Sequence, residues 1–203
     1  MSTVYTRIYD APPINRKEIL RYAGAKQTSE ELDALVDSCL AQVNDKLFYK
    51  VCYAKFDISF NEDSIDLGFM KSSSRDLRKN LSGCDSIVLF AATVGLTLDR
   101  LIARYGAVSP TKSLIFDAIG AERIESLCDI FNKEISQIAA TDGRKTCPRF
   151  SAGYGDFPIE AQNDIFTALA CPSKIGLSLG SNLLMSPSKS VTAIIGLSKK
   201  QEK

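Results

Sequence analysis

The sequence predicts an α+β fold, with a largely antiparallel sheet and flanking helices. Apolar residues recur with helical spacing in some segments and alternate with polar residues in others. The two kinds of segment follow one another in mixed order, with hairpin-like neighbours instead of a regular strand and helix alternation. Because no internal repeat or long linker divides the chain, we expect one domain over residues 1–203, with helices and a hairpin in 1–85, a core in 86–198 and a frayed tail in 199–203.

The first half of the chain predicts two helices and a hairpin. Residues 14–23 have a helical pattern that ends at a glycine, a typical C-terminal cap. Thr28 and Glu31 have the spacing of a capping box, so we expect the second helix to start there. Residues 48–60 alternate between apolar and polar side chains, which predicts a long half-buried strand, and residues 64–70 predict its shorter hairpin partner.

The middle of the chain predicts a short helix over residues 74–82, an apolar strand over 86–94 and a helix capped by Thr97. The longest helix follows. It is expected to run from Pro110, which suits a first helical turn, to about residue 140.

Two carboxylates interrupt the apolar stripe of this long helix. Asp117 and Glu125 fall on the face that also carries Leu114 and Cys128, and we expect that face to be core. A glycine-rich loop, a helix over residues 158–170 and a final strand over 191–197 complete the predicted elements.

Composition and charge exclude several function classes. The 25 Lys and Arg nearly cancel the 24 Asp and Glu, which argues against nucleic acid as the main partner. The chain has no histidine, so it cannot supply a Ser-His-Asp triad, a histidine zinc ligand or a histidine axial ligand. Its first residues lack the apolar region of a signal peptide, and no apolar run is long enough to cross a bilayer, so we expect a cytoplasmic protein without membrane contact.

The six cysteines are scattered, and no two form a C-x-x-C pair. Buried free thiols are therefore a better interpretation than a metal site or a disulfide framework.

The loop that begins at Arg149 is the most unusual segment. Gly153 and Gly155 flank Tyr154, and glycines allow a ligand to approach the main chain closely. The amides that start the next helix suit an anion, and the guanidinium of Arg149 can hold a carboxylate through two hydrogen bonds. The alternative is a tight turn in which the glycines only make the bend and Asp156 caps the helix that follows.

This loop resembles the Arg-x-x-x-Gly-Tyr signature of the activation domain of cobalamin-dependent methionine synthase. Arg149, Gly153 and Tyr154 match the signature, and Pro158 stands in the place of a family proline. From about residue 86 to 197 the order and spacing of the elements are those of the family, including a Met-Ser-Pro segment before the last strand. The resemblance implies a curved, mainly antiparallel sheet with flanking helices.

The resemblance also implies a function. In the family, cobalamin that has oxidised to an inactive cobalt(II) form is reduced by a flavodoxin-like or ferredoxin-like electron donor, and S-adenosylmethionine then supplies a methyl group that restores methylcobalamin. The protein binds and orients the methyl donor, which requires no histidine of its own. With no cobalamin module in this chain, the cobalamin is expected on a partner, either a methionine synthase or a related corrinoid methyltransferase.

The residues that the resemblance assigns to S-adenosylmethionine are Arg149, Ala152, Gly153, Tyr154, Glu125, Leu184 and Met185. Arg149 would contact the donor directly, and the three loop residues would line the groove largely through their backbone. Glu125 would lie near the charged methionine part of the donor. Its alternative is a structural ion pair with Arg123 or another basic residue, and Asp117 and Glu122 are weaker candidates for the same role.

The sequence departs from the family in three places. It lacks the Asp-Trp-Thr-Pro segment whose aspartate holds the amino group of the donor, and it lacks the histidine of the Ser-His-Pro segment before the last strand. Tyr154 is followed by Gly-Asp-Phe-Pro where the family has Pro-Ala-Cys-Pro. The alternative function is a non-catalytic interaction subunit that docks on a corrinoid protein without binding a methyl donor.

A nucleotide-binding fold of another kind has little support. A Rossmann-type methyltransferase would carry a glycine-rich turn directly after its first strand, and the nearest candidate is the single glycine of Ala-Thr-Val-Gly95. No phosphate-binding G-x-x-x-x-G-K-[ST] motif occurs either.

Overall fold

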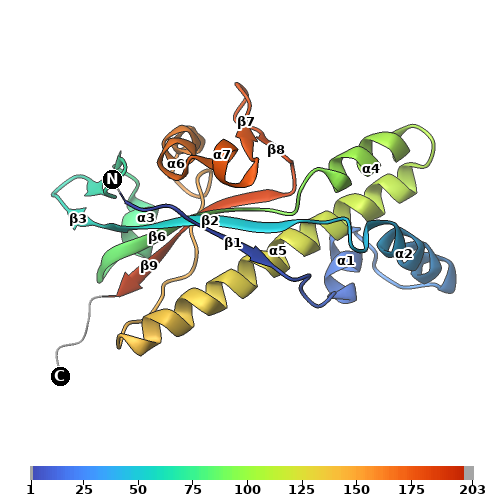
Figure 1. The fold of residues 1–203 in the computed structure, drawn as a ribbon, viewed down its shortest axis with the longest axis horizontal. Helices are drawn as coiled ribbons and strands as arrows, with labels where there is room; N and C mark the ends of the chain where they lie inside the picture. Colours follow the sequence, from blue (N-terminus) through green and yellow to red (C-terminus); the bar gives the residue numbers. More distant parts are fainter. Residues whose placement is uncertain (1, 199–203) are drawn as a thin grey trace.

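A four-stranded antiparallel sheet forms the centre of the protein (Figure 1). The computed structural model describes residues 2–198, so the tail expected at 199–203 lies outside the described residues. The strand order is β1-β2-β6-β9, from β1 (Tyr5–Tyr9), β2 (Tyr49–Asp57), β6 (Cys84–Thr93) and β9 (Ser190–Ser198). All neighbouring strands run antiparallel, which confirms the predicted α+β class.

Helices cover both faces of this sheet. They are α1 (Arg16–Tyr22), α2 (Glu30–Val43), α3 (Arg75–Asn80), α4 (Thr97–Gly106), α5 (Pro110–Thr141), α6 (Gln162–Leu169) and α7 (Cys171–Ile175), with a single 3-10 turn, η1, at Ile159–Ala161. The long helix α5 crosses one face together with α1, α2 and α4, whereas α3, α6 and α7 pack on the other (Figure 1). No helix among the described residues is both long and apolar enough to span a membrane.

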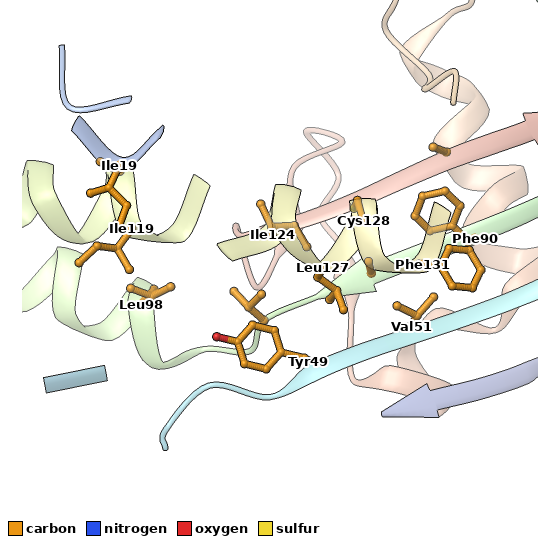
Figure 2. Close-up of a cluster of buried hydrophobic side chains, with 14 of the residues drawn as sticks. Ile19, Tyr49, Val51, Phe90, Leu98, Ile119, Ile124, Leu127, Cys128 and Phe131 are labelled. Carbon is orange, nitrogen blue, oxygen red and sulfur yellow. The ribbon is translucent and has the colours of Figure 1, made fainter. Parts of the chain in front are cut away.

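Alternation along the strands gives each face its own core. Val51 and Phe90 point toward α5, while their neighbours Cys52 and Ala91 point toward α6 and α7. Figure 2 shows the core on the α5 side, where the ring of Phe90 packs against that of Phe131 with 4.8 Å between centroids. The sheet is thus buried on both sides, although it is antiparallel.

Two small sheets extend from the centre. β3 (Ser59–Phe60), β4 (Ile65–Asp66) and β5 (Lys71–Ser72) form a three-stranded sheet, and β7 (Ser178–Leu179) pairs with β8 (Met185–Ser186). The predicted hairpin therefore exists, but its first strand is β3. The predicted strand over 48–60 is interrupted at Ile58, whose N–H bonds to the carbonyl of Asp85.

Several predicted helix starts are wrong in detail. Ser29, and not Thr28, caps α2 by accepting from the N–H of Leu32 at 3.2 Å. Thr97 does not cap α4, because its hydroxyl donates to the carbonyl of Lys46 at 2.7 Å. For α2 the cap is thus one residue later than expected, and for α4 the contact with the segment before β2 takes the hydroxyl away from the helix end.

The predicted buried face of α5 is also partly wrong. Leu114 is 49% exposed, and Asp117 lies at the surface, where it bonds to the ammonium of Lys189 at 2.7 Å. The carboxylate that is truly buried is Glu122, which is 2% exposed and pairs with Arg123 at 2.5 Å. Glu122 is tolerated there because it also accepts from the N–H of Asn15 and from a serine one turn along α5.

Candidate functional site

The site begins where the edge of β9 loses its partner. Phe150 and Ile194 exchange both backbone hydrogen bonds, at 2.9 and 2.8 Å. The segment before Ser151 therefore pairs with the outer edge of β9, like a short fifth strand of the sheet. Beyond Phe150 the chain turns away. Because residues two apart on a strand present their backbone groups to the same side, the N–H and C=O of Thr192 face the opening that this turn leaves.

A cavity of about 340 Å³ occupies this opening. Its walls come from α5, from the loop after Arg149, from the start of α6, from β8 and from the free edge of β9. The lining residues are Glu125, Arg149, Phe150, Ser151, Ala152, Tyr154, Gln162, Met185, Ser190, Val191 and Thr192.

Arg149 sits at the α5 wall with two carboxylates around it. Its guanidinium forms an ion pair with Glu125 and a second one with Asp129, at 3.0 Å. The three side chains form one cluster with a single positive and two negative charges. Glu125 and Arg149 line the cavity, whereas Asp129 pairs with Arg149 from outside the lining, so the cluster adds a net negative charge next to this wall. The side chain of Glu125 is 40% exposed, and that of Asp129 is 73% exposed. Because an exposed ion pair is weak, a ligand carboxylate can replace Asp129 as the partner of Arg149.

The loop after Arg149 is a tight turn built on its two glycines. Gly153 and Gly155 have φ angles of 91° and 53°, in the left-handed region that favours glycine. The N–H of Gly153 donates to the carbonyl of Phe157 at 2.8 Å, and the N–H of Phe157 donates to that of Tyr154 at 3.0 Å. Phe157 is 1% exposed and anchors the turn, whereas Tyr154 stands at the surface, 67% exposed.

Asp156 ties this loop to α3, some eighty residues earlier in the chain. Its carboxylate accepts from the hydroxyl of Ser74 and from the N–H groups of Arg75 and Asp76, the latter two at 2.8 and 3.1 Å. These bonds hold the pKa of Asp156 below its usual range. The expectation that Asp156 caps the next helix is therefore wrong: it caps the start of α3, and the N–H of Asp156 bonds back to the carboxylate of Asp76 at 3.3 Å.

The opposite wall of the cavity is polar but uncharged. Gln162 is 5% exposed, and its amide oxygen accepts from the hydroxyl of Thr192 at 3.3 Å. The hydroxyl of Ser190 lies 2.8 Å from the hydroxyl of Thr93 and 2.8 Å from the carbonyl oxygen of Pro187, which can accept its one proton. This wall can offer hydrogen bonds to a neutral group, whereas the α5 wall suits a charged one.

The structure brings five of the sequence-predicted site residues to the cavity wall: Glu125, Arg149, Ala152, Tyr154 and Met185. Gly153 lies between two of them and shapes the turn. Leu184 does not line the cavity; it is 67% exposed in the turn between β7 and β8. Glu125 was expected either to bind the donor or to form a structural ion pair. It forms an ion pair with Arg149 and also lines the cavity, so the two roles are compatible.

Sequence reasoning missed three components of the site. Asp129 lies one helical turn after Glu125 on α5, so the i, i+4 spacing could have indicated it. Gln162 and the free edge of β9 carry no local signal, because only the fold brings α6 beside β9.

The described residues provide no obvious protein nucleophile at the cavity. All six cysteines are free, and Cys128, the one next to Arg149 and Glu125, is completely buried. Burial raises the pKa of the Cys128 thiol to about 12, so it is a neutral thiol near pH 7. Within residues 2–198 there is also no cluster of three or more Cys, Asp or Glu suited to a metal ion.

Comparison with known proteins gives a match of fold. No protein-family model matches the sequence, and no curated protein does. Among solved structures, the crystal structure of the MetH reactivation domain bound to AdoHcy is similar to the chain with a TM-score of 0.68 and 14% sequence identity. The match covers 99% of this chain and 80% of that one. The chain thus has the fold of the MetH reactivation domain.

Proposed function

We propose that the protein binds S-adenosylmethionine in the cavity beside Arg149 and supports the reductive methylation of cobalamin on a partner protein. The observation that carries the proposal is the position of the cavity: the Arg-x-x-x-Gly-Tyr loop and Glu125 of α5 meet there, on a fold shared with a domain whose crystal structure contains AdoHcy. AdoHcy is the product that S-adenosylmethionine leaves after it gives up its methyl group.

The charges of the cavity suit the amino-acid end of this ligand. S-adenosylmethionine carries a sulfonium and an ammonium group, both positive, and one carboxylate. Glu125 can face the positive groups, while Arg149 can hold the carboxylate through its planar fork. Asp129 adds its negative charge from beside Arg149. The net negative charge of the cluster of Arg149, Glu125 and Asp129 also favours the charged donor over the neutral thioether that remains after transfer.

The methyl acceptor in this proposal is cobalamin on a methionine synthase or a related corrinoid methyltransferase. A flavodoxin-like or ferredoxin-like donor supplies one electron to cobalt(II), the methyl group passes from sulfur to the reduced cobalt, and AdoHcy leaves. The chain itself orients the donor and leaves the methyl group accessible. Tyr154 lines the cavity and Leu184 is the neighbour of the lining residue Met185; both are 67% exposed and give this face an apolar rim for the partner.

Calorimetric titration with S-adenosylmethionine tests the first step. We expect saturable binding to the wild type and a loss of at least about tenfold for Arg149→Met, because a charged hydrogen-bonding partner is removed. Arg144→Met is the matched control: Arg144 lies on the same connection and pairs with Asp85 at 2.7 Å, but it does not line the cavity. No heat at millimolar donor, or equal affinity in both variants, would contradict the proposal.

The partner is tested by affinity purification from the native host. We expect a co-purifying protein with the visible absorption spectrum of a corrinoid, and we expect the complex to bind S-adenosylmethionine. A corrinoid complex that forms but binds no methyl donor would instead support the alternative function, an interaction subunit without a methyl donor.

A further inference from the structure

Gln162 is a buried amide with unused hydrogen-bonding capacity. It is 5% exposed and lines the cavity from the first turn of α6. Its Oε1 accepts from Thr192, but its Nε2 donates to no partner among residues 2–198. Nε2 is not sealed from solvent either, so the cavity is where its two N–H groups can find an acceptor.

The bond from Thr192 fixes the direction of this amide. Because the hydroxyl donates to Oε1, the NH₂ group is left on the side away from Thr192. Oε1 keeps a second lone pair for another donor. The side chain therefore presents one donor and one acceptor side by side, on a wall that holds no charged residue.

The nearby edge of β9 adds to this neutral wall. The backbone groups of Thr192 point outward on the same side as those of Ile194, which bond to Phe150, and no described residue pairs with them. The charged cluster of Arg149, Glu125 and Asp129 belongs to the α5 wall. A ligand with one charged end and one neutral hydrogen-bonding end would thus be held in a fixed direction.

We propose that Gln162 reads the adenine base of the bound nucleoside, with Nε2 donating to a ring nitrogen and Oε1 accepting from the exocyclic amino group. This inference rests on the proposed function and assigns the base end of the same site. An amide is the side chain whose donor and acceptor match adenine in this paired way. The site then selects adenine over bases that present an acceptor where adenine has its amino group, or a donor where adenine has its ring nitrogen.

The test compares AdoHcy with S-inosylhomocysteine, in which a carbonyl oxygen replaces the amino group of adenine. We expect the wild type to bind AdoHcy roughly 5- to 150-fold more tightly, the range for a correct paired contact against a wrong one. In Gln162→Met the affinity for AdoHcy falls, and the two ligands bind within about threefold of each other. Calorimetry gives both constants.

Two further variants keep the test sharp. Gln162→Glu has nearly the same shape and keeps the acceptor for Thr192, but it loses the NH₂ group, so it too should bind AdoHcy more weakly. Gln42→Met is the matched control, since Gln42 is an amide on α2 that bonds to Ser38 and Tyr105, away from the cavity. Its discrimination should equal that of the wild type.

The outcomes separate the two proposals. If the wild type binds AdoHcy and the Gln162 variants keep full discrimination against the inosine analogue, the role of Gln162 is wrong and the binding function stands. Equal binding of the two ligands by the wild type also overturns the role of Gln162. If the wild type binds neither ligand, the proposed function itself fails.

Discussion

Arg149 meets the cavity with its charge already compensated by two carboxylates on one face of α5. Glu125 is the better shielded of the two, and Asp129 is largely exposed. A guanidinium in such a cluster stays oriented without a ligand, so less rotational freedom is lost when a ligand binds. The same cluster sets the sign of the field at the α5 wall.

This field predicts a preference that can be measured. Asp129→Asn should lower the affinity for S-adenosylmethionine relative to AdoHcy by up to about fivefold, because an exposed carboxylate contributes at most about 1 kcal/mol to a nearby positive charge. Added salt should reduce the preference of the wild type in the same direction. Asp85→Asn should leave the ratio unchanged, because Asp85 pairs with Arg144 and not with Arg149. An unchanged ratio in Asp129→Asn would mean that Asp129 does not act on the ligand.

Cys128 predicts how stability depends on pH. Its thiol has a pKa of about 12 in the folded protein, raised by burial from a reference value of 9.0. Between these values the unfolded chain has lost the proton while the folded chain keeps it, so the free energy of unfolding falls as the pH rises, by up to about 1.4 kcal/mol per pH unit. Urea denaturation from pH 8 to 11 should show a shallower slope for Cys128→Ala. Equal slopes would show that the thiol titrates normally.

At the scale of elements, the loop after Arg149 is positioned by α3. Asp156 and Asp76 bond across to each other's backbone, and a Cβ on Gly155 would collide with the carboxylate of Asp76. The φ angle of Gly155 adds strain for any other residue. The shape of the cavity wall therefore depends on a contact outside the cavity.

Gly155→Ala tests this dependence. We expect a loss of about 1–2 kcal/mol in the free energy of unfolding from the left-handed backbone, and in addition weaker ligand binding, because the loop must shift. Gly143→Ala is the matched control: its φ is +70°, and a Cβ there meets nothing within 4 Å, so only the stability should fall. Normal ligand affinity in a folded Gly155→Ala protein would show that ligand binding does not depend on the conformation of this loop.

The long elements could be predicted from the sequence because their apolar residues form clear patterns. α5 has helical spacing of apolar residues, and β6 and β9 are apolar runs. The bounds of these three elements differ from the predicted ones by at most two residues. β1 was missed because it is an edge strand with mostly exposed side chains, so its residues show no alternation. The cap of α3 was missed because Asp156 is remote in sequence.

At the scale of the molecule, the sheet connects the two halves of the site. β9 contributes the free edge, α5 on one face contributes the charged wall, and α6 on the other face contributes Gln162. From the sequence, the Arg-x-x-x-Gly-Tyr motif indicated Arg149 and the long helix indicated Glu125, but not Asp129. The neutral wall could not be predicted in this way, since it exists only where α6 and β9 come together.

A buried ion pair on α5, between Arg123 and Glu122, holds the N-terminal segment through hydrogen bonds to its backbone. Arg123 donates to the carbonyls of Pro12 and Pro13, at 2.6 and 2.8 Å, while Glu122 accepts from the N–H of Asn15. The two side chains are 3% and 2% exposed. These bonds join the start of the chain to the middle of the longest helix.

Arg123→Met should therefore destabilise the whole protein by about 3–5 kcal/mol, because Glu122 is left as a buried, uncompensated charge. Urea denaturation measures this loss. Arg21→Met is the control, since Arg21 pairs with Glu18 at the surface and should contribute little. A small effect of Arg123→Met would show that the pairing of β1 with β2 and the packing of α1 hold the N-terminal segment without this ion pair.

In the proposed function, S-adenosylmethionine binds at the junction of α5, the Arg149 loop, α6 and β9. The most direct test is to record the backbone amide resonances of the protein while the donor is added. We expect the shifts to concentrate at residues 149–154, Gln162 and 190–192, and α2 to stay unchanged. No shifts at millimolar donor, or shifts concentrated away from this junction, would contradict the account.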